Sequence, residues 1–446
     1  MNARTVLETI QRAALVGQSA RRVDATAKVT GEWVFGADYR APGMLHGKAV
    51  RSPYPHARVL QIDLEAARRV LGVRAVVTGK DAPYVHGSAI RDEPFLAGTE
   101  VRYAGEPVAA VAAVSEEVAV EAADLIRVEY EELPGIFDPL EAMQPGALLV
   151  HPDLGAYDRE PIFVPYPGTN VVNHAKIRSG DIGQGWRDSA EVFEDVFTTQ
   201  WIQHAPIEPH AAVAQVTADG RVVIWANTQS PYNFLREMAQ ALRLPQSRVR
   251  VIGLGVGGGF GSKLYPRLEP VAVALAMHTG GRPVKLTYTR EEEFTAAVTK
   301  HPAHITLKTG VKRDGTLVAR QITAVFNTGG YADTGPLVSR NGAFSGSGPY
   351  RIPHVWVDSY AIYTHNPLGG AFRGYGVPQL TWAHESQMDM IAHRLGVDPV
   401  ELRQRNLFDR GDRTCTGEAL SESVGIKETL RQALAASARP GRGHHA

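Results

Sequence analysis

The stretch RVRVIGLGVGGGFGSKLYPRLEP, at residues 248–270, is the part of the chain whose residue types and spacing point most clearly to chemistry. Six of the nine positions from 253 to 261 are glycine. Because glycine has no Cβ, successive glycines allow backbone N–H groups to approach an anionic or metal-oxo ligand closely. Phe260, a large apolar residue inside the run, argues against a merely mobile loop. The sequence therefore predicts a loop that contacts a polar ligand through its backbone.

The same stretch matches a dinucleotide-binding motif in its letters but not in its surroundings. Gly253, Gly255 and Gly258 satisfy G-x-G-x-x-G directly after the strand-like RVRVI. That motif must open a helix inside a βαβ unit, with an acidic residue about 20 positions later. Pro266 and Pro270 lie where the helix would run, a His-Thr pair stands near the expected acid, and we expect no parallel βαβ unit around the loop. A P-loop fails as well, because G-S-K replaces its G-K-[ST] ending.

Two further segments carry side chains that donate hydrogen bonds. WANTQSPYNFLREMAQAL, at 225–242, places Gln229 at the end of a predicted strand and just before a predicted helix. GGAFRGYGVPQ, at 369–379, contains Arg373 and, two residues later, Tyr375. An amide and a guanidinium can both donate to a polar oxo group without competing for a metal. Taken singly, Gln229 is also typical of a helix start, and Arg373 of a surface ion pair.

These segments must be positioned by a chain that divides into four parts. We predict a polar N-terminal segment at 1–25, a compact α+β unit at 26–135, a linker rich in Pro and Gly at 136–182, and a larger mixed domain at 183–446 that ends in a helix. In the second part SEEVAVEAADLI is a predicted helix with Ser115 as its N-cap. The predicted fold class is therefore α+β and multidomain.

Composition excludes several classes of function. The 446 residues carry 47 Lys and Arg against 47 Asp and Glu, so no net field favours nucleic acid or an anionic membrane. The single cysteine, Cys415, rules out an iron–sulfur cluster held by this chain alone, and we expect an ordinary loop thiol there. No signal peptide is evident, and apolar runs such as VAAVAAV at 108–114 are too short to span a bilayer. We expect a cytoplasmic protein without a membrane span or a nucleic-acid partner.

Nine segments, taken in order, resemble the molybdenum-binding subunit of the xanthine dehydrogenase/aldehyde oxidase family of molybdenum hydroxylases. They are RVDATAKVTG, PGMLHGKAVRSPYPHARV, RYAGEPVAAVAA, NTQSP, VGGGFGSK, GRPVKLTYTREEEF, PYRIP, GGAFRGYGVPQ and ELRQRNLF. Their spread over residues 22–408 makes the resemblance far more specific than any one motif. It implies that residues 26–135 form the family's small α/β hammerhead domain, and that the larger block is the first half of the molybdopterin-binding region.

The resemblance assigns roles to the residues in these segments. Gln229 is expected beside the apical oxo group of molybdenum, and Arg373 beside the same metal centre. The glycine loop is expected to supply backbone amides to the metal's oxygen and to the pterin through Gly258, Gly259, Phe260 and Gly261. Gln229, Phe260 and Arg373 are therefore the residues expected nearest the metal. The resemblance implies molybdenum bound to molybdopterin cytosine dinucleotide as the cofactor.

The chain departs from the family pattern in length. Family subunits carry a second molybdopterin-binding half whose G-E motif provides a base glutamate, and this chain ends about where that half begins. The segment Gly105–Glu106–Pro107 belongs to the hammerhead region and does not match that motif. We therefore assign no catalytic residue to this chain. Its layout resembles the split subunits of nicotinate dehydrogenase, which implies a second molybdopterin-binding subunit with the glutamate, an iron–sulfur subunit with 2Fe–2S clusters and an FAD subunit.

Three positions bear on the substrate. Leu264 stands where xanthine-oxidising members have a glutamate, so a hydrogen-bond partner for a purine is missing and xanthine is disfavoured. Tyr375 matches an aromatic residue that stacks on the substrate ring, and its hydroxyl is equally suited to bond the substrate or a neighbouring residue. Arg340 and Asn341 fall near a substrate-contacting arginine, and we take Arg340 as the contact. The expected reaction is oxidation of an aromatic N-heterocycle or an aldehyde, with water as the oxygen source.

Two other functions stay open at this point. The first is a non-catalytic scaffold subunit of such a complex, although the joint presence of Gln229, Phe260 and Arg373 argues against it. The second is an NAD-dependent dehydrogenase that uses the loop from Gly253 to Gly258.

The segment WIQHAPIEPHAAVAQV, at 201–216, contains residue types that bind metals. His204, Glu208 and His210 lie within seven positions. Two prolines and a following strand pattern favour a structural turn into a sheet instead. We expect these residues to have structural roles.

Overall fold

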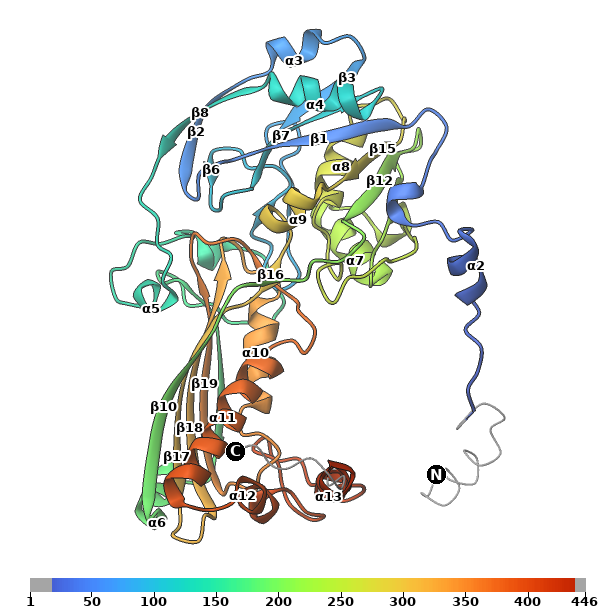
Figure 1. The fold of residues 1–446 in the computed structure, drawn as a ribbon. Helices are drawn as coiled ribbons and strands as arrows, with labels where there is room; N and C mark the ends of the chain where they lie inside the picture. Colours follow the sequence, from blue (N-terminus) through green and yellow to red (C-terminus); the bar gives the residue numbers. More distant parts are fainter. Residues whose placement is uncertain (1–17, 438–446) are drawn as a thin grey trace.

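The computed structural model describes residues 18–437, so most of the predicted N-terminal segment at 1–25 lies outside the described part. The chain forms two lobes, each built around one large sheet (Figure 1). The upper lobe in Figure 1 contains a seven-stranded sheet of order β14-β13-β12-β15-β1-β7-β3. Its strands are β1 (Leu45–Arg51), β3 (Val73–Thr78), β7 (Pro107–Ala113), β12 (Ala211–Val216), β13 (Val222–Ala226), β14 (Val249–Gly253) and β15 (Val284–Thr287). Helices α7 (Pro231–Ala241) and α8 (Glu269–Ala276) pack against it, and every residue of α8 is buried.

This sheet joins two parts that we predicted as separate regions. Strands β1, β3 and β7 come from 26–135, whereas the other four come from the region that starts at 183. Strand β1 pairs with β15 in parallel, with Leu45 opposite Val284. The apolar patterns predicted the strands, but a pattern of side chains does not specify which sheet a strand joins. The two regions therefore share one sheet and one hydrophobic core.

The rest of the small α/β region forms a layer beside this sheet. It contains a three-stranded sheet of β6 (Glu100–Val101), β2 (Ala57–Asp63) and β8 (Arg127–Glu132), the pair β4 (Val85–His86) and β5 (Glu93–Pro94), and the helices α3 (Glu65–Arg69) and α4 (Glu116–Asp124). Helix α2 (Ala25–Thr30) has no buried residue and lies apart from this layer (Figure 1). Helix α4 begins where we predicted, because the Ser115 hydroxyl accepts a hydrogen bond from the Val118 N–H at 3.3 Å.

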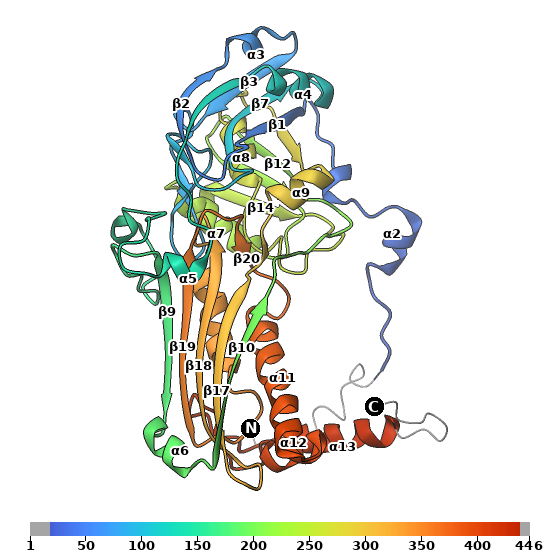
Figure 2. The same cartoon turned by 60° about the vertical axis from the view of Figure 1, so that its left-hand side comes forward.

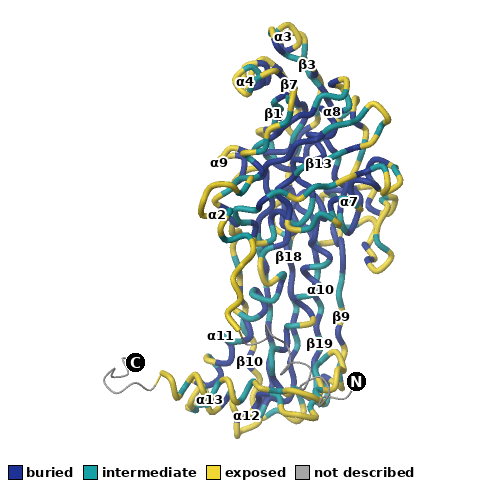
Figure 3. Tube along the Cα trace, turned by 90° about the vertical axis from the view of Figure 1, so that its right-hand side faces the viewer, coloured by how far each residue is buried: buried dark blue, intermediate teal, exposed yellow. Residues whose placement is uncertain are grey.

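The lower lobe is a long, narrow five-stranded sheet of order β10-β17-β18-β19-β9, with its strands side by side in Figure 2. Its strands are β9 (Val171–Ser179), β10 (Glu191–Thr199), β17 (Ala303–Val311), β18 (Leu317–Gly329) and β19 (His354–Tyr363). Helices α10 (Gly335–Ser345) and α11 (Val377–Leu395) pack against it, with α5 (Pro139–Ala142), α6 (Ile182–Asp188), α12 (Pro399–Asn406) and α13 (Ile426–Ser437) at its ends. Figure 3 shows that burial is concentrated in the two sheets and in α8, while α13 is largely exposed. In the span from 18 to 437, none of the helices combines the length and the apolarity that a membrane crossing requires.

Strand β9 lies inside the stretch 136–182 that we predicted as a linker. It pairs with β19 in antiparallel register, with Ile177 opposite Val357. The glycines and prolines before it made the whole stretch resemble a linker, but they end at about the point where the strand begins. The last part of that stretch therefore belongs to the five-stranded sheet.

The expectation of no parallel βαβ unit near the glycine loop is wrong. Strands β13 and β14 pair in parallel, with α7 as the connection between them. The loop nevertheless follows the second strand of this unit, and the next helix, α8, begins only at Glu269. No helix opens at the glycines, so the geometry of a dinucleotide-binding loop is missing.

A small sheet connects the two lobes. It consists of β11 (Ile202–Gln203), β16 (Thr299–Lys300) and β20 (Gly369–Gly370), with β16 in the middle and parallel to β20. Helix α9 (Arg290–Thr295) precedes β16 and begins with a capping box in which Thr289 and Glu292 exchange hydrogen bonds.

Gly105 provides a test of how the two regions are joined. Its φ is +105°, and a Cβ there would lie 2.3 Å from the Thr295 carbonyl oxygen at the end of α9. Gly105→Ala combines backbone strain with a collision against main chain, and we expect it to lower the free energy of unfolding by about 2–4 kcal/mol. The control Gly43→Ala has a positive φ of +67° but open space around it, and should lose only about 1 kcal/mol. Equal losses in denaturant unfolding of the two variants would contradict this packing.

Candidate cofactor site

Two neighbouring parallel strands bring the first two predicted segments together. The Gln229 turn (residues 227–230) leaves the end of β13, and the glycine loop (residues 254–264) leaves the end of β14. The last pair in the ladder is Ala226 opposite Gly253. Because parallel neighbours end at the same edge of a sheet, the two segments emerge side by side. Their proximity follows directly from the strand pairing.

Hydrogen bonds then fix the Gln229 side chain on the loop. The Gly261 N–H donates to Gln229 Oε1 at 2.9 Å, and the Gln229 N–H donates to the Lys263 carbonyl oxygen at 2.9 Å. A backbone N–H can only donate, so the side-chain atom facing Gly261 must be the oxygen. The Gln229 NH₂ group is consequently left to donate elsewhere, and the residue is exposed. The amide therefore presents a donor at the surface of the site.

The glycines of the loop are required by close backbone contacts. A Cβ on Gly259 would lie 2.4 Å from Gln229 Oε1. Gly261 has a φ of +112°, and a Cβ there would lie 2.3 Å from the Ala371 carbonyl oxygen. Phe260 adopts the left-handed region with a φ of 52° although it is not glycine, and its side chain is 49% exposed. A strained, exposed aromatic residue is typical of a functional loop.

The middle of the loop offers unused hydrogen-bond donors. Within residues 18–437 the N–H groups of Gly258, Gly259 and Phe260 donate to no other residue, whereas those of Gly257, Gly261 and Ser262 do. Three consecutive N–H groups are thus available to donate to a ligand, and successive backbone N–H groups of this kind bind anions and oxo groups. We call residues 258–260 the donor arc.

The Arg373 loop (residues 371–376) closes the site from the other lobe. It follows β20, and the Arg373 N–H donates to the Phe260 carbonyl oxygen at 2.9 Å. Its bend depends on left-handed conformations at Gly374, Tyr375 and Gly376. Arg373 is exposed, and its guanidinium has no hydrogen-bond or ion-pair partner among the residues described. The backbone of Arg373 thus contacts the donor arc, and its guanidinium is available to donate to a ligand.

The residues predicted to contact substrate lie around this loop. Leu264 follows the glycines and donates its N–H to the Gly261 carbonyl oxygen at 3.2 Å. Tyr375 is partly buried, and burial raises the pKa of its hydroxyl well above the ordinary value. The Asn341 side chain donates to the Tyr375 carbonyl oxygen at 2.6 Å, whereas the Arg340 guanidinium lies over the Phe344 ring at 5.3 Å. Because residues 340 and 341 point to different sides of α10, the structure favours Asn341 over Arg340 near Tyr375.

The segment from His204 to His210 contacts both the glycine loop and the Arg373 loop, which the sequence did not predict. His204 Nε2 donates to the Ala371 carbonyl oxygen at 2.7 Å, and its ring packs on Phe372 with 4.4 Å between centroids. His210 Nε2 lies 3.1 Å from the Ser262 carbonyl oxygen, and its Nδ1 lies 2.7 Å from Glu293 Oε1. The prediction of structural roles placed these residues in a turn. The structure places them between the two loops, as their supports.

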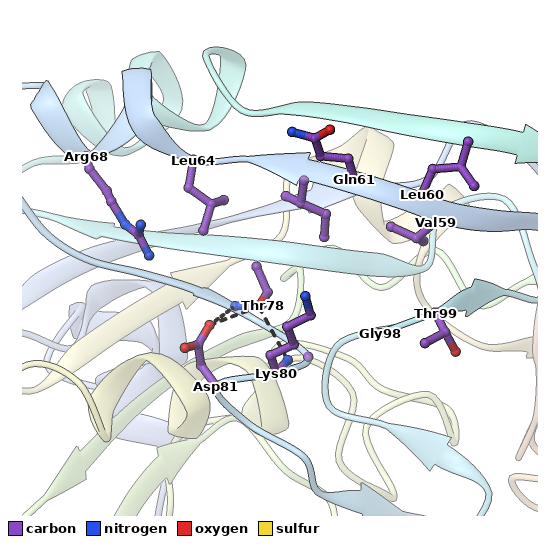
Figure 4. A pocket seen from close by; sticks show the side chains of 12 residues that line it. Val59, Leu60, Gln61, Leu64, Arg68, Thr78, Lys80, Asp81, Gly98 and Thr99 are labelled. Atoms are coloured by element: carbon purple, nitrogen blue, oxygen red, sulfur yellow. Dashed lines mark hydrogen bonds between the residues drawn. The ribbon is translucent and has the colours of Figure 1, made fainter.

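Two other features lie away from this site. A cavity of about 380 Å³ in the small α/β region is lined by side chains that include Arg68, Thr78, Lys80 and Asp81, and by none of the predicted site residues (Figure 4). Glu106 is buried, accepts hydrogen bonds from the Tyr331 hydroxyl and the Arg102 N–H, and has its pKa raised by burial to about 7. Glu106 contacts none of the three loops described above.

Comparisons with known proteins identify the family. The aldehyde oxidase and xanthine dehydrogenase a/b hammerhead domain matches residues 30–134, and the molybdopterin cofactor-binding domain matches residues 164–407. The chain is 38% identical to the nicotinate dehydrogenase large molybdopterin subunit of Eubacterium barkeri, over 94% of this chain and 95% of that protein. It is 36% identical to the xanthine dehydrogenase molybdenum-binding subunit of Escherichia coli, over 92% of this chain and 54% of that protein.

Solved structures agree with these matches. The aldehyde oxidoreductase of Desulfovibrio gigas superposes with a TM-score of 0.85 at 30% identity, over 94% of this chain and 46% of that one. Quinoline 2-oxidoreductase of Pseudomonas putida gives 0.84 at 28% identity, over 95% of this chain and 54% of that one. This chain therefore belongs to the molybdenum-binding subunits of the xanthine dehydrogenase and aldehyde oxidase family of oxidoreductases. It spans nearly all of the nicotinate dehydrogenase protein and about half of the other three proteins.

His204 makes the stability of the folded chain depend on pH. Burial lowers its pKa from the ordinary 6.5 to about 4. As pH falls through this window the unfolded chain binds a proton before the folded chain does, so stability is lost from about pH 6.5 down to about 4. Between pH 6.5 and pH 4, the free energy of unfolding of His204→Gln should therefore fall by about 2–3 kcal/mol less than that of the wild type, as measured by denaturant unfolding. His393→Gln, at an exposed position on α11, is the control, and an identical pH profile for both variants would contradict the assignment.

Proposed function

We propose that this chain provides one half of a molybdenum site in a complex that hydroxylates an aromatic N-heterocycle or an aldehyde, with water as the oxygen source. The observation that carries the proposal is the donor surface formed by the donor arc, the Gln229 NH₂ and the Arg373 guanidinium. Every one of these groups donates hydrogen bonds and none is a metal ligand. Such a surface suits an anionic group that brings its own metal ligands and carries oxo or phosphate oxygens.

The residues of this chain fit the molybdenum cofactor of the family. The N–H groups of Gly258, Gly259 and Phe260 and the Gln229 amide would hold its oxygens, and Arg373 would add a permanent positive charge. When bound, the cofactor supplies the two-electron oxidation of a substrate carbon. A Cβ at position 259 would collide with Gln229, and a Cβ at position 261 would collide with the Ala371 carbonyl oxygen, so both positions require glycine. With glycine there, no side chain stands between this backbone and a ligand. We propose the cytosine dinucleotide form of the cofactor.

A second polypeptide is proposed to complete the site. The acidic side chain that contacts the glycine loop directly, Glu208, is buried and already paired with Lys263, so it is not free to act as a base. We place the catalytic glutamate on a second molybdopterin-binding subunit, and 2Fe–2S clusters and FAD on further subunits. The match along nearly its whole length to a protein named as the large molybdopterin subunit of nicotinate dehydrogenase supports this division.

The substrate side of the site favours a ring that carries hydrogen-bond acceptors. Leu264 contributes no charge, and the Tyr375 and Tyr265 hydroxyls stay protonated because burial raises the pKa of both, that of Tyr265 to about 12. A protonated phenol donates to a ring nitrogen or a carboxylate. The protonated phenols suit an N-heterocycle, and Leu264, which offers no carboxylate to a purine, disfavours xanthine among such rings.

Gly259→Ala tests the donor surface without removing a charge. Its Cβ would displace the Gln229 side chain, which lies 2.4 Å away, and would narrow the space above the donor arc. We expect the complex purified with its partner subunits to retain less than about a tenth of the wild-type molybdenum by elemental analysis, which corresponds to a loss of at least about 1.4 kcal/mol in affinity. Gly98→Ala, where a Cβ would meet open space, is the control and should retain molybdenum. Wild-type molybdenum content in Gly259→Ala would contradict the proposed site.

Metal analysis of the chain alone tests the shared site. We expect the isolated chain to hold no tightly bound molybdenum and the complex to hold it stoichiometrically. Stoichiometric molybdenum in the isolated chain would contradict the role of a second subunit. A complex that turns over an NAD-linked substrate without any metal would contradict the function itself.

A further inference from the structure

The carboxylate of Glu208 contacts the glycine loop at two positions, one on each side of the donor arc. Its Oε2 accepts hydrogen bonds from the Gly257 N–H at 2.5 Å and from Lys263 Nζ at 3.0 Å, and its Oε1 accepts from the Gly36 N–H at 2.8 Å. Lys263 Nζ also donates to the Glu208 carbonyl oxygen at 2.7 Å. Gly257 precedes the donor arc and Lys263 follows it, so one carboxylate links the chain on both sides of the arc.

The Lys263 ammonium is buried and bonded to Glu208, so it is not available to a ligand. Its side chain is 1% exposed, and that of Glu208 is 9% exposed. Burial lowers the pKa of Lys263, while the charge of Glu208 counteracts this effect. A buried ammonium that loses its partner is strongly destabilised, so each charge requires the other. The positive charge facing a ligand therefore comes from Arg373, and the lysine of G-S-K has an internal role.

The donor arc needs this support because its backbone is strained. Gly258 has a φ of +105°, and Phe260 has a φ of 52° without being glycine. Such conformations persist only where the surroundings fix them. The carboxylate of Glu208 binds Gly257, the residue before the arc, and through the Lys263 ammonium it also holds the chain three residues after Phe260. A second link, the bond from the Gly255 N–H to the Val34 carbonyl oxygen at 3.1 Å, fixes the start of the loop.

We propose that Glu208 and Lys263 are positioning residues, whose ion pair holds the donor arc in the conformation that presents its N–H groups to the cofactor. This rests on the proposed function for the identity of the ligand, but the effect on the loop is a property of the chain itself. Neither residue touches the ligand in this account. The segment that looked like a structural turn in the sequence therefore controls the shape of the site.

The test compares Glu208→Gln with a matched control. Glu208→Gln keeps the size of the side chain but removes its charge, so we expect amide hydrogen exchange in the peptide covering 257–263 to accelerate at least tenfold in the isolated chain. In the complex we expect faster release of molybdenum during dialysis. Glu292→Gln removes another ion pair, to Lys48 at 3.1 Å and Arg51 at 3.2 Å, away from the loop. It should lower the unfolding temperature without changing exchange at 257–263 or molybdenum release.

A double variant separates positioning from stability. Glu208→Gln with Lys263→Met removes the unpaired buried charge, so its unfolding temperature should recover toward the wild type while loop exchange stays fast and molybdenum is still lost. Loop exchange in Glu208→Gln equal to that in Glu292→Gln would overturn the proposal, and so would fast exchange with wild-type molybdenum retention. A wild-type complex without molybdenum would instead overturn the proposed function, because the exchange experiment does not involve the cofactor.

Discussion

The parallel pairing of β13 with β14 is the constraint on which the site depends. It places the Gln229 turn and the glycine loop at one edge of the seven-stranded sheet, where Gly261 and Gln229 bond each other. Once the amide oxygen is fixed in that way, the amide nitrogen is available to a ligand. The same loop then contacts the Arg373 loop through Phe260, so one element links donors from both lobes. Most of the donors are therefore main-chain N–H groups, which remain when a side chain is substituted.

Buried charges keep the lobes in register around that surface. Arg267, three residues after Leu264, pairs with Glu93 of the small α/β region at 2.9 Å and with Asp333 at the start of α10. All three side chains are largely buried, so loss of Arg267 would leave two carboxylates in the interior without their shared partner. The arginine therefore ties the end of the glycine loop to both neighbouring regions. Such a fixed arrangement of loops suits the proposed role of holding a cofactor together with a second polypeptide.

The sequence predicted the family and the α+β fold class correctly, and it missed particular elements and contacts. Gln229, the glycines, Phe260 and Arg373 were found because they recur as an ordered set of motifs, and the structure brings them together. Strand β9 was missed because Gly and Pro dominate the stretch before it. The βαβ unit was missed although its strand, helix and strand follow one another in the sequence, because that order does not by itself specify that β13 and β14 are neighbours in one sheet. Glu208 was assigned to a turn because its partner Lys263 lies 55 residues away, and neither residue type indicates the other. Local pattern predicts elements, whereas contacts between distant segments decide the role of each polar residue.

The central claim is that the donor arc, Gln229 and Arg373 face a molybdenum centre held between this chain and a second one. The most direct measurement is an anomalous difference map, recorded at the molybdenum edge, from crystals of the purified complex. The account predicts one peak per copy of this chain, at the interface between the two polypeptides and in front of residues 258–260. A peak bounded entirely by the other polypeptide, with Gln229 and Arg373 remote from it, would contradict the account.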